Sequence, residues 1–168
     1  AKARRLRPLQ RGTLNIEHRA LVIGGGLAGL TAALSIAEQG YPVFLVEKET
    51  SLGGHLRHIK VGHADSNPQQ LLAETLEKVS KQPRISVMLE SEVTEVSGYV
   101  GQYQTKIQSA SGEISEIAHG IIVVATGARE IQPATYGYGQ LPGVITQHEL
   151  EENLDQHIPA GSPGKSVL

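Results

Sequence analysis

One glycine-rich stretch constrains the fold of this chain more than any other feature. An apolar run over residues 21–23 is followed at once by three glycines in the spacing G-x-G-x-x-G, which are Gly24, Gly26 and Gly29. Apolar residues then recur at helical intervals, at Leu27, Leu30, Leu34 and Ala37. Gly40 is placed to end that helix. The order predicts a strand buried on both faces, a tight turn and a helix.

The three glycines have separate physical roles in such a turn. Gly24 permits the turn itself, and Gly29 lets the helix pack closely on the strand. Gly26 has no Cβ, so a pyrophosphate can approach the backbone there and face the free N–H groups and the dipole of the helix start. The stretch therefore predicts a phosphate-binding turn.

The next segment supplies the acidic residue that a dinucleotide site needs. Residues 41–46 predict a second strand, and Glu47 follows it, 23 residues after Gly24. A carboxylate at that distance meets the hydroxyl groups of a ribose. Methyltransferases share part of this pattern, so the motif alone predicts a dinucleotide or adenosine site and leaves the reaction open.

The middle of the chain predicts an α/β domain with an antiparallel insert. Asn67 and Pro68 suit the N-cap and the first position of a helix, whose apolar residues are Leu72, Leu76 and Val79. We expect strands over 84–89 and over 121–124. Between them, three segments predict a β-meander: 92–100, 103–109 and 113–118. The fold class is therefore a Rossmann-like parallel sheet with flanking helices and an inserted antiparallel β-meander.

The last part of the chain is less regular. A loop rich in glycine, tyrosine and proline spans 129–142, and we expect a short strand over 144–146 and a short helix over 147–153. The domains that we predict are a basic leader or linker over 1–19, a Rossmann-like domain over 20–156 with its insert at about 92–118, and a linker over 157–168 that begins a truncated segment.

Charge is unevenly distributed along the 168 residues. The chain has 15 basic and 17 acidic residues, a net charge of −2, and residues 1–11 hold five of the basic residues and no acid. That basic run has no aromatic residue on which a base could stack, so it indicates a solvated linker and not a nucleic-acid site.

Several function classes are excluded by what the sequence lacks. The chain has no cysteine, so it holds no disulfide framework, redox-active cysteine pair or thiolate-bound iron–sulfur cluster. No apolar run reaches the about 18 residues of a transmembrane helix, and we expect a cytoplasmic protein. Four residues are candidate metal ligands: His55, His58, His63 and Asp65. Their spacing matches no established ligand pattern, so we predict no metal site.

Three features together resemble the two-dinucleotide-binding-domain flavoproteins, in which a β-meander interrupts an FAD-binding Rossmann domain. They are the glycine turn, Glu47 followed by Gly53-Gly54, and an apolar strand that ends in Ala125-Thr126-Gly127. A narrower resemblance is to the A subunit of heterodisulfide reductase and its homologues. It rests on 20–29 with 46–48, and on 97–101, 136–139 and 146–151.

The resemblance implies an FAD site, residue by residue. The pyrophosphate would lie on the turn and the helix start, at Gly24, Gly26, Leu27, Ala28 and Gly29. Glu47 would bind the adenosine ribose with Lys48 beside it, and the backbone of Val93 would meet the adenine. Gly54 and His55 would line the path toward the flavin. The pyrophosphate side would be closed by Ala125, Thr126 and Gly127.

The resemblance also implies an activity. The chain would be the FAD-binding domain of a larger flavin-dependent oxidoreductase that exchanges electrons with other redox subunits of a complex. Alone it would be inactive and hold FAD poorly, because segments that enclose the flavin ring lie outside it. Two alternatives stay open: an NAD(P)-binding domain of a pyridine-nucleotide dehydrogenase, and a non-catalytic Rossmann-like assembly module. No acid or base residue is evident, and Tyr136 and Tyr138 either stack on a ring or cover the sheet.

Overall fold

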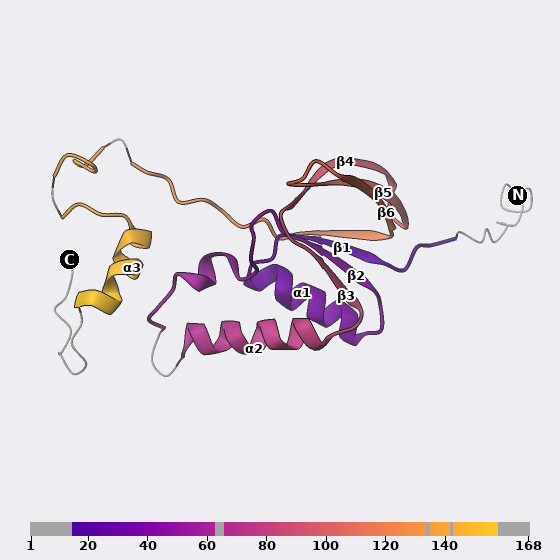
Figure 1. Cartoon of the computed structure of the whole chain (residues 1–168), viewed down its shortest axis with the longest axis horizontal. Helices are drawn as coiled ribbons and strands as arrows, with labels where there is room; N and C mark the ends of the chain where they lie inside the picture. Colours follow the sequence, from indigo (N-terminus) through magenta and orange to yellow (C-terminus); the bar gives the residue numbers. More distant parts are fainter. Residues whose placement is uncertain (1–14, 63–65, 134, 142, 158–168) are drawn as a thin grey trace, which may run out of the picture.

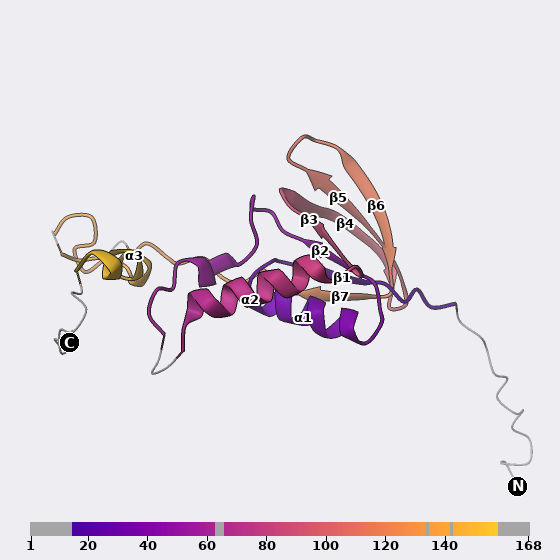
Figure 2. The same ribbon diagram turned by 60° about the horizontal axis from the view of Figure 1, so that its bottom comes forward.

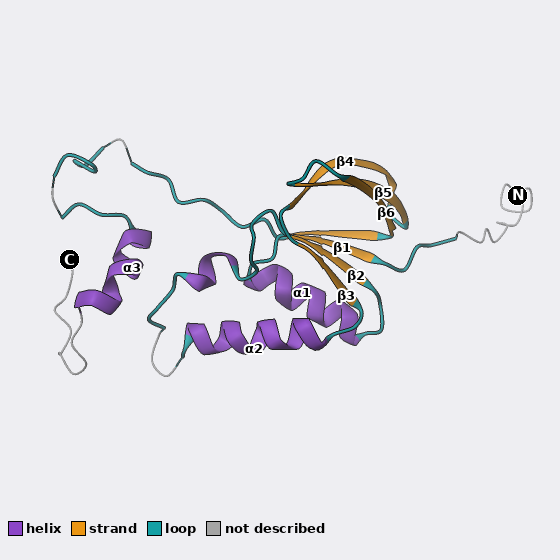
Figure 3. Ribbon diagram, viewed as in Figure 1, coloured by secondary structure: helices purple, strands orange, loops and turns teal. Residues whose placement is uncertain are grey.

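A computed structural model describes residues 15–62, 66–133, 135–141 and 143–157. These residues include eleven helices and strands. Figures 1 and 3 show their arrangement. In chain order they are β1 (Ala20–Ile23), α1 (Leu27–Glu38), β2 (Val43–Val46), the 3-10 helix η2 (Gly54–Arg57), α2 (Pro68–Lys81), β3 (Ile85–Met88), β4 (Ser91–Tyr99), β5 (Gln102–Ser109), β6 (Ile114–His119), β7 (Ile121–Val124) and α3 (Gln147–His157).

Two sheets and a helical layer build the body of the domain. The larger sheet has the strand order β3-β2-β1-β7, and its paired strands are parallel. The smaller sheet is the antiparallel meander β4-β5-β6. Figure 2 shows α1 and α2 on one face of the parallel sheet and the meander on the other. The predicted α/β fold with an inserted meander is confirmed.

Alternate residues of β1 fill the two cores on either side of the parallel sheet. Ala20 and Val22 pack with buried side chains of α1 and α2. Leu21 faces the other way and packs with Val46 and with Ile107 of the meander. Because both faces are covered, the central strands are apolar throughout.

Helix α1 ends as the sequence predicts. Gly40 adopts φ +97°, its N–H donates to the Ala37 carbonyl, and the Tyr41 N–H donates to the Ile36 carbonyl. This pair of bonds is the Schellman motif, which glycine favours. The predicted apolar face is partly wrong at its start, because Leu27 lies on the surface and is 36% exposed while Leu30 and Ala37 are buried.

Helix α2 also begins as predicted. The Asn67 side chain accepts a hydrogen bond from the Gln70 N–H at 3.0 Å, and Pro68 is the first helical residue. Leu72 and Val79 are buried against α1 and the sheet. The cap and the apolar face thus place α2 beside α1, as its sequence pattern indicates.

Three predictions for helices and strands differ from the structure by more than one residue at an end. The strand expected over 41–46 begins only at Val43, because the chain first leaves the Schellman turn through Tyr41 and Pro42. Residues 144–146 form no strand, since they lead directly into the cap of α3. That helix extends beyond the expected 147–153, to His157.

The end of the expected leader packs on the meander. The Glu17 N–H donates to the Gly101 carbonyl, and the Gly120 N–H donates to the Arg19 carbonyl. The remaining predictions for 1–14, for His63 and Asp65, and for 158–168 lie outside the described residues. Among the described helices, none combines the length and the apolar character that crossing a membrane requires.

Candidate functional site

The predicted site residues gather at the carboxyl ends of three parallel strands. The chain runs from β1 to β2 on one side and reaches β7 on the other, so the strand order reverses beside β1. In open α/β sheets, ligands bind in the crevice at such a switch point. Gly24 follows β1, Glu47 follows β2 and Ala125 follows β7.

Two of the three glycines are required by the protein itself. Gly24 adopts φ +106°, and a Cβ there would clash with the Ala125 carbonyl oxygen. A Cβ on Gly29 would clash with the Gly24 carbonyl oxygen, because α1 passes very close to the turn. Both glycines are therefore explained by folding alone.

Gly26 is different, because neither its conformation nor its neighbours require glycine. Its φ of −72° and ψ of 178° are open to any residue, and a Cβ would meet no atom within 4 Å. Gly26 is the N-cap of α1, and neither a side-chain cap nor an acidic residue occupies the first turn. The backbone of Gly26, Leu27 and Ala28 thus borders open space at the positive end of a helix.

Glu47 ties the glycine turn to the end of β2. The side chain is only 8% exposed. Its Oε2 accepts a hydrogen bond from the Gly25 N–H at 2.6 Å, and its Oε1 accepts one from the Glu49 N–H at 2.9 Å. Each carboxylate oxygen has a second lone pair, so these bonds leave acceptor capacity for a ribose hydroxyl. Sequence reasoning assigned Glu47 only the ribose role and missed this structural one.

The Gly53-Gly54 loop packs directly on the glycine turn. The Gly53 N–H donates to the Gly25 carbonyl at 2.8 Å, and Gly53 pairs with Gly26 as an isolated parallel bridge. A Cβ on Gly54 would lie 3.1 Å from the Gly26 Cα. The Leu52 side chain lies over Gly25, and no sequence motif predicts this contact. The loop therefore forms one wall beside the open start of α1.

The remaining predicted residues lie farther from the glycine turn. His55 Nε2 lies 2.6 Å from the Ala128 carbonyl oxygen and so joins this loop to the chain after β7. Lys48 forms an ion pair with Glu49 at 3.4 Å. Thr126 and Gly127 are exposed just beyond β7.

Val93 lies in β4, and its half-buried side chain packs on the core of the meander. The strand register shifts between Val93 and Glu95, so the β4–β5 ladder is irregular at that point. The Ser91 N–H donates to the Glu47 carbonyl at 3.0 Å and brings the start of β4 beside the acidic residue. The side chain of Val93 is therefore used in packing.

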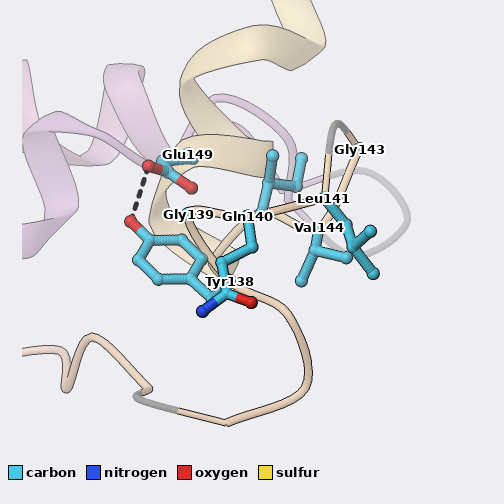
Figure 4. Close-up of a pocket in the computed structure, with 8 residues that line it drawn as sticks. Tyr138, Gly139, Gln140, Leu141, Gly143, Val144 and Glu149 are labelled. Atoms are coloured by element: carbon cyan, nitrogen blue, oxygen red, sulfur yellow. Dashed lines mark hydrogen bonds between the residues drawn. The ribbon is translucent and has the colours of Figure 1, made fainter.

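A hollow of about 390 Å³ lies in the 138–149 segment, away from the predicted site. Figure 4 shows the Tyr138 ring directed toward Glu149. The Tyr138 hydroxyl donates to Glu149 Oε1 at 2.9 Å, and this hydrogen bond raises the pKa of Tyr138. The Tyr138 hydroxyl thus bonds to a residue of α3. Tyr136 is 88% exposed.

Comparison with protein families gives a match over most of the chain. The family described as pyridine nucleotide-disulphide oxidoreductase matches residues 18–159. A relative from Methanopyrus kandleri, the second A-type iron-sulfur subunit of its CoB--CoM heterodisulfide reductase, is 41% identical over 119 residues, which are 70% of this chain and 18% of the relative. A heterodisulfide reductase A-subunit-like protein of Archaeoglobus profundus is 39% identical over 109 residues, 64% of this chain and 16% of that protein. The chain thus spans about a fifth of the length of these relatives, and the predicted resemblance is confirmed.

Solved structures support the fold. L-proline dehydrogenase from P. horikoshii superposes with a TM-score of 0.57 at 24% identity, covering 67% of this chain and 22% of that one. The p-nitrophenol 4-monooxygenase PnpA from Pseudomonas putida gives a TM-score of 0.53 at 15% identity, covering 68% and 42%. At these identities the likeness shows a shared fold.

Proposed function

Because the chain belongs to the pyridine nucleotide-disulphide oxidoreductase family, we propose that it is the FAD-binding domain of a larger oxidoreductase resembling the A subunit of heterodisulfide reductase. The observation that carries the proposal is the open space at Gly26, where the protein itself needs no glycine. A pyrophosphate would occupy that space and accept hydrogen bonds from the start of α1.

The neighbouring groups fit the adenosine half of the cofactor. Glu47 lies beside the turn with both carboxylate oxygens already oriented by backbone N–H groups. Its free lone pairs would accept the ribose hydroxyls, and its charge would repel a 2′-phosphate. The site therefore favours an unphosphorylated adenosine ribose, as in FAD or NAD.

The Gly53-Gly54 loop favours FAD over NAD. NAD-binding Rossmann domains usually lack a Gly-Gly pair after the acid, whereas here the pair packs on Gly26. A bound flavin would supply the electron transfer, and this chain would bind and orient it. With no cysteine, the chain supplies no thiolate ligand for an iron–sulfur cluster, so electrons would reach such clusters only on other segments or subunits.

Titration of FAD, ADP, NADH and NADPH into the purified chain tests this function. We expect FAD and ADP to bind with affinities within about tenfold of each other, because the proposed site residues would contact mainly the adenosine and pyrophosphate half. NADPH should bind most weakly. Tighter binding of NADH than of FAD would favour the dehydrogenase alternative, and no binding of any nucleotide would favour the assembly module.

A pair of valine substitutions localises the binding. Gly26→Val should abolish binding of FAD and ADP without unfolding the chain, because its side chain enters open space. Ser35→Val places the same residue on the exposed side of the same helix and should leave both affinities unchanged. Equal affinities for the two variants would remove Gly26 from the site.

A further inference from the structure

We propose that His58, His148 and Glu152 bind a divalent transition-metal ion, with Zn²⁺ as the preferred ion. The sequence predicted no metal site because His58 was weighed only with its neighbours in the chain. The structure brings His58, which follows η2, against two residues of α3. This inference stands independently of the proposed nucleotide site.

The three ligand atoms are already spaced for a metal. His58 Nδ1 lies 3.4 Å from Glu152 Oε1, and His148 Nε2 lies 3.5 Å from the same oxygen. All three atoms lie within 4.8 Å of one another. Zinc bonds to histidine nitrogen and carboxylate oxygen are about 2.0–2.2 Å long, so ligand atoms in a tetrahedral site are about 3.3–3.5 Å apart. Two of the three separations match this value.

Helix α3 holds its two ligands in place. His148 and Glu152 are four residues apart, so they lie on one face of the helix. The start of α3 is fixed from outside, because the His148 N–H donates to Glu130 Oε1 at 2.9 Å. It is fixed from within by a capping box, in which Thr146 and Glu149 each accept the backbone N–H of the other.

The third ligand is supported from α2. The Gln69 side-chain amide donates to the Leu56 carbonyl at 3.0 Å and to the Ile59 carbonyl at 2.7 Å. These two residues flank His58, and the His58 N–H itself donates to the His55 carbonyl. Both sides of the site are thus positioned by hydrogen bonds that do not involve the ligand atoms.

The chemistry of the three side chains is suited to zinc. Two imidazoles and one carboxylate are ligands that zinc takes in proteins, whereas Mg²⁺ and Ca²⁺ prefer oxygen ligands. The centroids of the two imidazole rings are 4.4 Å apart. The side chains are 44%, 33% and 52% exposed, which leaves a fourth position for water. A metal here would join α3 to η2, the element that follows the loop packed on the glycine turn.

Competition between the 168-residue chain and a chromophoric chelator for Zn²⁺ tests the site. We expect the chain to take one zinc ion from the chelator. His58→Ala and His148→Ala should each weaken zinc affinity by more than the about 10–100-fold that loss of a supporting group costs. Glu152→Gln should weaken it as well, since the amide carries no charge.

His18→Ala is the matched control, because His18 is exposed and stacks on Tyr41 outside the site. It should leave zinc affinity unchanged, and circular dichroism should show that every variant is folded. Cobalt(II) in place of zinc should give the visible absorption of a tetrahedral site, which both histidine variants should lose. Failure of the chain to displace the chelator, or equal zinc affinity in the histidine variants and the control, would overturn the proposal.

Discussion

Helices α1 and α3 begin in opposite ways. The start of α3 has its backbone donors occupied by Thr146, Glu149 and Glu130. The start of α1 has Gly26 as its N-cap and no side-chain cap. Yet α1 is the helix that the core holds, with four buried residues, whereas Figures 1 and 2 show α3 beyond η2 and apart from both sheets.

The difference shows where a fold leaves room for a ligand. A helix that packing does not hold depends on its caps, which satisfy the N–H groups of its first turn. A helix that packing holds can leave those groups open, and in α1 they face the space beside Gly26. The contrast therefore supports the proposal that the backbone N–H groups at the start of α1 bind an anion.

The largest effect on stability should come from adding a side chain where α1 contacts the glycine turn. Gly29→Ala places a Cβ against the Gly24 carbonyl oxygen, which is backbone and cannot move aside cheaply. We expect the free energy of unfolding to fall by about 3 kcal/mol, the upper end of the range for overpacking. Urea denaturation measures it, with Ser35→Ala on the exposed side of α1 as control. A loss equal to that of the control would mean that α1 does not depend on this contact.

The second effect concerns the carboxylate that holds the turn. Glu47→Gln replaces one of two acceptor oxygens by an NH₂ group that faces a backbone donor. We expect a loss of about 2 kcal/mol of unfolding free energy, as for a buried donor left unsatisfied. Glu49→Gln, whose side chain is 67% exposed, should change it little. Equal urea midpoints for the two variants would contradict the structural role of Glu47.

A smaller effect tests the caps of α3 directly. Thr146→Ala removes one arm of the capping box and should cost about 1 kcal/mol of local helix stability. Hydrogen exchange of the α3 amides should accelerate while exchange in α1 stays unchanged. Thr31→Ala on α1 is the control, because Thr31 bonds to the Leu27 carbonyl within the helix and is no cap. Acceleration in both helices would break the contrast.

The smallest effect is a pH dependence of the packed body that holds α1. His119 is fully buried, its Nε2 lies 2.7 Å from Thr105 Oγ1, and burial lowers the pKa of the imidazole. The unfolded chain therefore binds more protons below about pH 6.5, and stability should fall as the pH drops through that value toward the lowered pKa. His119→Gln should flatten the slope of unfolding free energy between about pH 7 and pH 5. Parallel slopes would remove His119 as the cause.

The sequence predicted those features in which one residue meets one local demand. Gly40 ends α1, Asn67 caps α2, and the glycine turn lies between β1 and α1, all as expected. The three predicted strand segments of the meander are also found, between β3 and β7. Local patterns of this kind can be read without knowing the neighbours in space.

Other features depend on residues that the chain brings together from a distance. Glu47 orients Gly25 only because β1 and β2 are parallel neighbours, so the sequence could not show that bond. His58 likewise lies close to His148 and Glu152 of α3 only in the folded chain, because these residues are far from it in the sequence. One signal was present and missed: Thr146-Gln147-His148-Glu149 has the T-x-x-E spacing of a capping box, and residues 144–146 were predicted as a strand instead.

Amide chemical shifts during an ADP titration test the central claim most directly. The account predicts the largest shifts at Gly26, Leu27 and Ala28, with a second group at Glu47 and Glu49, because the pyrophosphate would contact the open start of α1 and the ribose would contact the carboxylate. The amides at the start of α3 should not move, since the donors of His148 and Glu149 are already occupied. Shifts centred on the 138–149 hollow, or none in the glycine turn at saturating ADP, would contradict the account.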